Sequence, residues 1–229
     1  MRTPSKNQES DKLMVTRWNP IRSKADYRRF LDEDLKAHNL KRWGVTSPLR
    51  KPEVYYQRLM RRVEYLNSKS GPLNRLFLFY ARYRLQRFSI RTGISFPPGV
   101  SDMGLSIAHY GSIVVNAKAR IGKYCRIHSA TNIGTAGGGV PTIGDYVYIG
   151  PGAVIYGDIT VGDRAVIGAN AVVNRDVPSG VTVAGVPARV IAERDSSYIV
   201  PIWFPNHRGR SSELRAQNIS QTVDESTAS

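Results

Sequence analysis

The chain has 229 residues and a mass of 25.5 kDa, which suits one domain with an appendage or two small domains. Hydrophobic residues make up 41% of it and charged residues 22%. The sequence contains no run of 18 apolar residues, so it predicts no transmembrane helix. The first residues lack the apolar run of a secretory signal, and the one cysteine, Cys125, excludes an intramolecular disulfide and a zinc-type cysteine cluster. We therefore expect a cytoplasmic protein that holds no metal.

The net charge of +15 is concentrated in the first part of the chain. Residues 1–93 hold 22 Lys and Arg against 8 Asp and Glu, whereas residues 94–191 hold 7 against 5. Such a segment is typical of contact with an anionic partner, here a membrane surface or an acidic glycan, but it equally fits a solvated helical surface. No recognisable nucleic-acid module surrounds the arginines, so nucleic acid is not an expected partner. The membrane alternative places the protein peripherally at the inner face of the membrane.

Two helices are predicted from capping and turn residues in this basic region. Ser23 and Asp26 have the spacing of a capping box, which predicts a helix at about 24–38. Pro52 is favoured in a first turn and predicts the start of a second helix. Both segments carry apolar residues at intervals of three and four, which indicates one buried face each.

A third helix is predicted at about 73–89, after the helix-breaking pair Gly71-Pro72. Arginines punctuate this helix, which excludes a membrane span but permits a helix at a membrane interface. The favoured interpretation is that its aromatic face packs against the next domain. The large apolar residues of this helix are Leu76, Phe77, Tyr80, Tyr83 and Phe88.

A strict six-residue period replaces the helical spacing after about residue 94. From residue 121 to residue 178 the chain can be written in rows that each begin with Ile or Val, and Gly follows in most rows. One row, IGTAGGGVPT, is four residues longer than the rest. Three six-residue sides close a triangular coil whose first-position aliphatic residues point inward and stack about 4.8 Å apart. The period therefore predicts a mainly β fold, a parallel β-helix of roughly five coils.

These patterns divide the chain into four parts, which differ in charge and periodicity. They are a leader that we expect to be disordered (1–22), a basic α-helical region (23–93), a β-helix domain (94–191) and a largely flexible C-terminal tail (192–229).

Four stretches of the β region carry a closer likeness to known proteins: GLSIAHYGSIVVNAKARIG (104–122), TNIGTAGGG (131–139), IGDYVYIGPGAVIYGDITVGDRAVIGANAVV (143–173) and AGVPARVI (184–191). With them the chain resembles the hexapeptide-repeat acyltransferases, and more narrowly the serine O-acetyltransferases and their relatives in surface-polysaccharide biosynthesis. The resemblance implies a left-handed parallel β-helix, a homotrimer, and acetyl-CoA as the co-substrate in the groove between neighbouring prisms.

His109 is the candidate general base. Ile107 and Val115 are eight residues apart instead of six, so His109 lies beside an irregularity of the kind that often aims a side chain at a ligand. The resemblance places the family's catalytic histidine at the same position. A neutral imidazole can take the proton of an acceptor hydroxyl while that hydroxyl attacks the thioester of acetyl-CoA.

The other three histidines are less favoured. His38, at a predicted helix end, and His207, in a polar tail, are expected at the surface. His128 follows an inward Ile and is expected at an outer corner, with substrate contact as the less favoured alternative.

The resemblance also indicates the remaining site residues. It points to Gly134 and Thr135, at the entry to the long row, for backbone N–H groups that stabilise the oxyanion, and Gly134 is assigned to the cofactor site as well. Small residues would let the pantetheine arm of CoA lie close to the coils, and two arginines would bind its phosphates. These residues are Ala153, Ala169, Ala184, Gly185, Arg175 and Arg189.

The expected acceptor follows from departures from the serine enzymes. Those enzymes carry an acid directly before the catalytic histidine, where this chain has Ala108, and another in the region that matches Gly93–Ser95, where this chain has none. They also carry a histidine after the Gly-rich loop, where this chain reads GGGVPTIG. We therefore expect the hydroxyl of a sugar or surface glycan as the acceptor. The alternatives are serine O-acetylation in cysteine biosynthesis and a noncatalytic β-helix scaffold.

Overall fold

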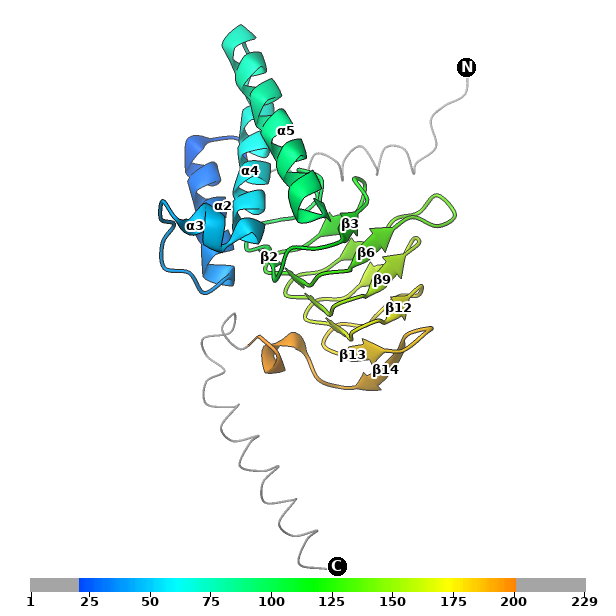
Figure 1. Cartoon of the computed structure of the whole chain (residues 1–229). Helices are drawn as coiled ribbons and strands as arrows, with labels where there is room; N and C mark the ends of the chain where they lie inside the picture. Colours follow the sequence, from blue (N-terminus) through cyan, green and yellow to red (C-terminus); the bar gives the residue numbers. More distant parts are fainter. Residues whose placement is uncertain (1–20, 201–229) are drawn as a thin grey trace, which may run out of the picture.

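The computed structural model describes residues 21–200, in which a group of helices stands on one end of a β prism (Figure 1). The predicted capping box is confirmed, because the backbone N–H of Asp26 donates to Ser23 Oγ at 3.0 Å. The structure adds one short helix, α3, that the sequence analysis did not predict. The helices are α2 (Lys24–Ala37), α3 (Ser47–Arg50), α4 (Pro52–Asn67) and α5 (Pro72–Thr92).

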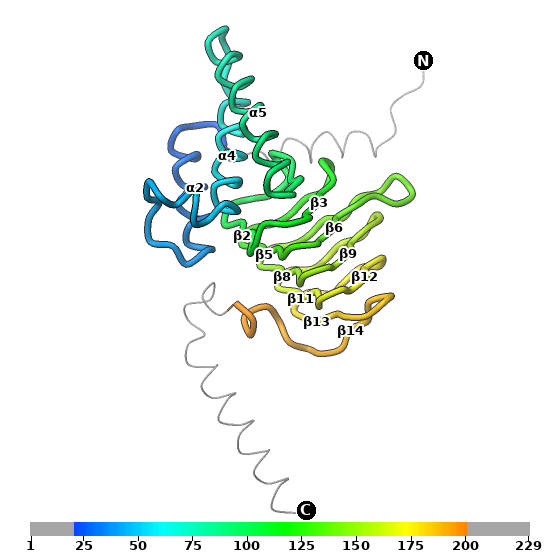
Figure 2. The backbone as a smooth tube through the Cα atoms, in the orientation of Figure 1, coloured from blue at the N-terminus to red at the C-terminus, as the bar shows by residue number. Residues whose placement is uncertain are grey.

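Three parallel sheets form the faces of the prism, so the predicted β-helix with N-terminal helices is confirmed (Figure 2). The five-stranded sheet holds β1 (Ile94–Ser95), β3 (Ile113–Val115), β6 (Asn132–Gly134), β9 (Val154–Tyr156) and β12 (Val172–Val173). The three-stranded sheet holds β4 (Arg120–Ile121), β7 (Thr142–Ile143) and β10 (Thr160–Val161). The six-stranded sheet holds β2 (Ser106–Ile107), β5 (Arg126–Ile127), β8 (Tyr148–Ile149), β11 (Val166–Ile167), β13 (Thr182–Ala184) and the antiparallel β14 (Arg189–Ala192).

The interior of the prism is the aliphatic stack that the six-residue period predicts. Ile133 pairs with Ile155 in the five-stranded sheet, and Ile127 pairs with Ile149 in the six-stranded sheet. All four side chains are fully buried. Burying one such side chain contributes about 1.5–3 kcal/mol, so the period specifies both the shape and the stability of the domain.

The corners and the close stacking of coils depend on different positions of the repeat. The fourth position of successive rows has a positive φ, as at Tyr146 and Asn170, and this backbone makes the corner. The glycine at the second position instead permits close approach between coils. A Cβ on Gly144 would lie 2.8 Å from the backbone nitrogen of Asp163, and one on Gly162 would lie 2.5 Å from that of Ser179.

The four additional residues of the long row leave the prism as a loop after β6 (Figure 1). Ala136 and Gly139 exchange two backbone hydrogen bonds of 3.2 and 3.1 Å across this loop. The strands on either side keep their register, since Ile121 still pairs with Ile143 across the insertion. The insertion therefore presents a turn at the surface without disturbing the core.

A buried ionic network joins the helices to the first coil. The Arg61 side chain is fully buried, and its Nε lies 2.9 Å from Asp34 Oδ2 while its Nη1 lies 3.1 Å from Glu64 Oε2. Its guanidinium also donates to the backbone carbonyls of Ser101 and Asp102, at 2.9 and 2.6 Å. Arg61 therefore holds both helical carboxylates and the start of the β domain.

The two carboxylates of this network bind the same segment of the first coil. Asp34 accepts a hydrogen bond from the backbone N–H of Leu105 at 3.0 Å, and Glu64 accepts one from that of Gly99 at 2.7 Å. These bonds fix residues 99–105, which lead directly into β2 and then to His109.

Helix α5 does not pack as expected, because most of its large apolar side chains face solvent. It contacts α4 and β1 mainly through the face that carries Ala81, Leu85 and Phe88. Leu76, Phe77, Tyr80 and Tyr83 are each more than half exposed. The expected packing against the next domain is therefore confirmed at Phe88 but wrong for Leu76, Phe77, Tyr80 and Tyr83.

The two ends of the chain lie partly outside the described residues. The predicted leader is described only from residue 21, and the predicted tail only to residue 200, so His207 falls outside. Within the tail, Ser196 is buried and its Oγ donates to the backbone carbonyl of Tyr146 at 2.6 Å. The first residues of the predicted flexible tail therefore pack on the prism.

Candidate active site

His109 lies at the corner between β2 and β3, where the two additional residues of the irregular segment are accommodated. The backbone on either side is anchored, since Ala108 N–H donates to Ile127 at 2.9 Å and Gly111 N–H donates to Thr92 at 2.8 Å. The His109 side chain itself is exposed. A rigid backbone therefore presents an accessible imidazole, which is what a base acting on a bound hydroxyl needs.

His128 lies directly beside His109, one coil along. The two ring centroids are 6.0 Å apart, and the Tyr148 ring follows at 5.1 Å from His128. The pKa of His128 is lowered to about 4, first by burial and then by electrostatic interaction with Arg126 and with the His109 ring. His128 is therefore neutral at pH 7, and the expectation of a simple corner residue understates its place in this cluster.

Arg126 is a residue of this cluster that the sequence analysis missed. It is half-buried on β5, two residues before His128, and its Nη1 donates to Ser106 Oγ at 2.9 Å. Burial lowers the pKa of Arg126, although the guanidinium stays charged at neutral pH. Arg126 opens no repeat row, so only its spatial position near His128 could have identified it.

His38 is not the surface residue that its sequence position suggests. Its Nε2 lies 2.7 Å from Gln57 Oε1, and burial lowers the pKa of His38 to about 4 despite this hydrogen bond. Gln57 is fully buried and also binds β2, accepting from Ile107 N–H at 3.2 Å and donating to Leu105 at 2.6 Å. The helical region thereby fixes the strand that precedes His109.

One edge of the prism collects His109 and part of the predicted cofactor site. This edge, which we call the histidine edge, comprises the corners that follow β2, β5, β8, β11 and β13. Ala169 follows β11 there, Ala184 ends β13, and Gly185 follows it. Arg189 pairs with Ala184 across β13 and β14 and is exposed. A row of small residues therefore runs from His109 toward an exposed arginine, as a pantetheine arm and its phosphates require.

The remaining predicted site residues lie at the opposite edge of the five-stranded sheet. Gly134 ends β6, Thr135 opens the Gly-rich loop, and Arg175 follows β12. Thr135 Oγ1 donates to the backbone carbonyl of Gly139 at 2.8 Å. We call this the loop edge. Because His109 precedes β3 and Gly134 ends the parallel β6, one chain does not bring His109 and the predicted oxyanion donors together.

Two small residues of the β region are interior residues. Ala153 has no exposed surface and packs in the aliphatic core, so its methyl group supports the stack instead of lining a surface site. Cys125 is also fully buried, with its Sγ 3.1 Å from the Gly144 carbonyl. Burial raises the pKa of the Cys125 thiol, which makes this cysteine a poor nucleophile.

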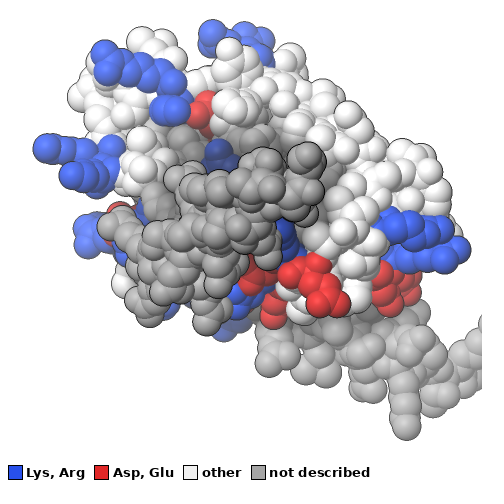
Figure 3. Space-filling view, turned by 90° about the horizontal axis from the view of Figure 1, so that it is seen from below, with Lys and Arg blue, Asp and Glu red and all other residues white. Residues whose placement is uncertain are grey.

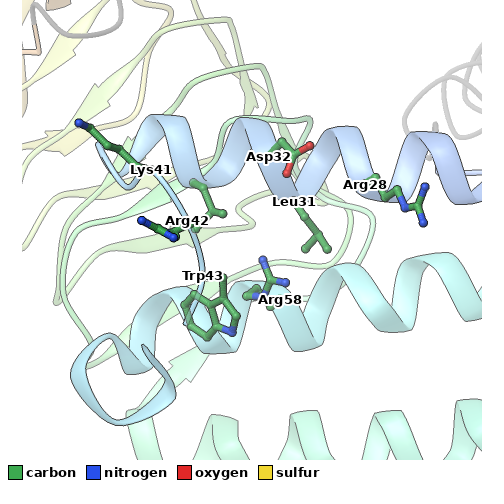
Figure 4. A pocket seen from close by; sticks show the side chains of 8 residues that line it. Arg28, Leu31, Asp32, Lys41, Arg42, Trp43 and Arg58 are labelled. Atoms are coloured by element: carbon green, nitrogen blue, oxygen red, sulfur yellow. The ribbon is translucent and has the colours of Figure 1, made fainter. Parts of the chain in front are cut away.

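The helical region contains a hollow of about 340 Å³, remote in sequence from His109. It lies between α2, α4 and the segment that joins α2 to α3 (Figure 4). Arg58 covers the Trp43 ring there at 4.8 Å. Basic side chains predominate in its lining, which consists of Arg28, Leu31, Asp32, Leu35, Lys41, Arg42, Trp43 and Arg58.

Comparison with known proteins agrees with this geometry. Residues 141–175 match the family model for the bacterial transferase hexapeptide, which spans six repeats. A serine acetyltransferase of Helicobacter pylori strain J99 is 35% identical over 170 residues, which cover 72% of this chain and 94% of that protein. The chain belongs to the serine acetyltransferase family. Its β-helix is thus the hexapeptide-repeat domain of that family.

The likeness to other family members covers only part of the length of those proteins. A serine acetyltransferase of Synechococcus elongatus is 39% identical over 105 residues, so this chain spans 43% of that relative. A solved structure of a serine acetyltransferase in complex with CoA is 28% identical and has a TM-score of 0.59. That likeness covers 73% of this chain and 70% of the solved one.

Proposed function

We propose that this protein transfers an acetyl group from acetyl-CoA to a hydroxyl, with His109 as the general base. The observation that carries the proposal is the position of His109. Its exposed side chain lies on a corner whose backbone is hydrogen-bonded on both sides, and the small residues of the histidine edge extend from there to Arg189. Its membership of the serine acetyltransferase family and the CoA bound to a structural relative support acetyl-CoA as the donor. A noncatalytic scaffold would not need an accessible histidine beside a second, neutral one.

The chemistry is a direct transfer. The acceptor hydroxyl gives its proton to His109 as its oxygen attacks the thioester carbonyl, and the bond to sulfur breaks as the tetrahedral intermediate collapses. Backbone N–H groups at Gly134 and Thr135 stabilise the oxyanion of that intermediate. His109 returns the proton to the departing thiolate, so free CoA and the acetyl ester leave a neutral enzyme.

A homotrimer supplies both halves of this site. The histidine edge and the loop edge are opposite edges of one sheet, so His109 of one copy meets Gly134 and Thr135 of the next when prisms pack side by side. We expect light scattering to give three times the chain mass of 25.5 kDa. Activity should also return when inactive His109→Ala chains are mixed with inactive Thr135→Pro chains during refolding. A fully active monomer would contradict this arrangement.

Serine is the first acceptor to test, ahead of the sugar hydroxyl that the sequence favours. The relatives compared are named serine acetyltransferases, which supports the serine alternative better than the glycan one. The glycan is the second candidate because Ala108 stands where the serine enzymes carry an acid, and the segment GGGVPTIG lacks the histidine that they carry after the Gly-rich loop. Mixing the full chain with acetyl-CoA and each acceptor, and detecting released CoA thiol, decides between them. Acetyl transfer to neither class would contradict the proposed function.

A further inference from the structure

A positive charge that no carboxylate of residues 21–200 pairs with lies near His128, the neighbour of His109. Arg126 is half-buried, and its side-chain hydrogen bond goes to the neutral hydroxyl of Ser106. Within residues 21–200, no carboxylate forms an ion pair with Arg126, whereas Arg61 pairs with two carboxylates and Arg164 with one. A partly desolvated guanidinium is costly unless an anion compensates it, so this site favours an anionic ligand.

The groups around Arg126 also favour an anionic ligand. Its charge acts on both His38 and His128, whose imidazoles burial holds neutral, and neither ring offers the negative charge that would compensate a guanidinium. His128 Nε2 is buried and has no hydrogen-bond partner. An unsatisfied polar atom of this kind is typical of a place that a ligand or water completes. An ammonium group would meet only positive or neutral groups among these neighbours.

We propose that Arg126 binds a carboxylate of the acceptor, whose hydroxyl then faces His109. This inference rests on the proposed function and narrows the acceptor to hydroxyl compounds that carry an acid group. An ammonium group contributes nothing to binding here. Serine and an acidic sugar both meet the requirement, whereas a neutral sugar does not.

Three small acceptors separate the contribution of the carboxylate from that of the ammonium group. They are compared in the full-length enzyme with saturating acetyl-CoA. L-serine carries both charged groups, glycerate carries the carboxylate alone, and serinamide carries the ammonium alone. We expect glycerate and serine to have similar kcat/KM values and serinamide a value at least ~10-fold lower, the range for a lost hydrogen bond to a charged group. Equal kcat/KM for all three, with turnover that still needs His109, would overturn the inference and leave the acetyl transfer intact.

Variants of Arg126 test whether this residue binds the acceptor carboxylate. Arg126→Gln should raise KM for serine and glycerate at least ~10-fold, with little change in kcat and none for serinamide. Arg126→Lys should keep part of the affinity, because it keeps the charge but loses the planar fork. The matched control is Arg120→Gln, since Arg120 is also half-buried, precedes an inward Ile, and donates to the backbone at Lys118 and Ala119. An unchanged KM in a folded Arg126→Gln trimer would refute the assignment.

If none of the three compounds is acetylated, the proposed transfer to small acceptors is contradicted, and the anion site is then tested by a binding measurement. Calorimetric binding of glycerate to the wild-type protein but not to Arg126→Gln would still support the anion site. Equal binding, or none to either protein, would overturn it.

A separate feature of the structure is the exposed apolar surface at the N-terminal end of helix α5. Its first half presents five large side chains that are 54–71% exposed, and we call them the apolar tip. This part of α5 forms the end of the molecule opposite β14 (Figure 1). No helix among the described residues is long and apolar enough to cross a membrane. The apolar tip consists of Leu73, Leu76, Phe77, Phe79 and Tyr80.

The second half of α5 is basic. Arg84, Arg87 and Arg91 line a hollow of about 260 Å³ together with aromatic and aliphatic side chains of α4 and α5. The 21-residue helix has five arginines and no acidic residue. The face seen in Figure 3, by contrast, carries acidic and basic side chains together. Apolar side chains beside uncompensated arginines complement a surface that is apolar below and negatively charged above.

We propose that α5 docks on an anionic phospholipid surface, with the apolar tip in the acyl boundary and the arginines at the headgroups. The full-length protein should sediment with vesicles of phosphatidylglycerol and phosphatidylcholine at low salt, and much less with phosphatidylcholine alone. The double variant Leu76→Ser/Phe77→Ser and the triple variant Arg84→Gln/Arg87→Gln/Arg91→Gln should each bind at least ~10-fold more weakly. Leu49→Ser, at an 88% exposed leucine of α3, is the control and should bind normally.

Two results would overturn this docking. One is the absence of binding to the anionic vesicles at low salt, or binding that both α5 variants retain. The other is assembly beyond the proposed trimer that light scattering detects in the wild type and that Leu76→Ser/Phe77→Ser abolishes, because a further copy would then cover the apolar tip.

Discussion

Replacing His109 by alanine is expected to lower turnover at least ~100-fold, the usual scale for one acid–base group. The imidazole acts on the acceptor oxygen, whereas CoA lies along the small residues of the histidine edge, so the affinity for acetyl-CoA should barely change. The fold should also survive, because the His109 side chain is exposed and both neighbouring backbone segments keep their hydrogen bonds. Turnover by thiol release and acetyl-CoA affinity by calorimetry, measured on the same preparations, test this expectation.

The control for this experiment is Lys123→Ala. Lys123 is exposed beside a corner of the prism between β4 and β5, away from the histidine edge, so its removal should leave turnover unchanged. His128→Ala is unsuitable as a control because the two imidazole centroids are 6.0 Å apart. Near-normal turnover of His109→Ala with an acceptor that the wild type acetylates would refute the general-base mechanism.

Replacing Arg61 by methionine is expected to cost about 3–5 kcal/mol of unfolding free energy, as for the breaking of a buried ion pair by loss of one partner. The variant leaves Asp34 and Glu64 buried without their cation and removes the donors to the carbonyls of Ser101 and Asp102. Urea unfolding measures this loss as a fall in the midpoint at an unchanged slope. Because this network fixes the segment before β2, we expect activity to fall as well.

Arg62→Met provides the matched control. Arg62 is the next residue on α4 and is exposed, so its substitution should change the unfolding free energy by no more than about 0.5 kcal/mol. A loss below about 1 kcal/mol for Arg61→Met would show that the network contributes little to the junction between helices and prism.

The sequence alone determines the β-helix and the position of its candidate base. The aliphatic residue at the start of each row can be recognised from the local sequence. Burying this residue in every row requires the chain to form stacked triangular coils. The break in the period between Ile107 and Val115 likewise locates His109 on a corner without any knowledge of its neighbours. The capping box at Ser23 fixes the start of α2 by contacts within one turn.

The tertiary structure decided which residues accompany His109 and where the helices leave charge and apolar surface exposed. His128 is 19 positions from His109, and Arg126 is distinguished by its position near His128 and by the lack of an ion-paired carboxylate among the described residues. The exposure of Leu76 and Phe77 depends on which face of α5 meets α4, because the apolar residues of this helix do not all lie on one face. Such facts arise from packing between segments far apart in sequence, which a local period or a capping pattern does not encode.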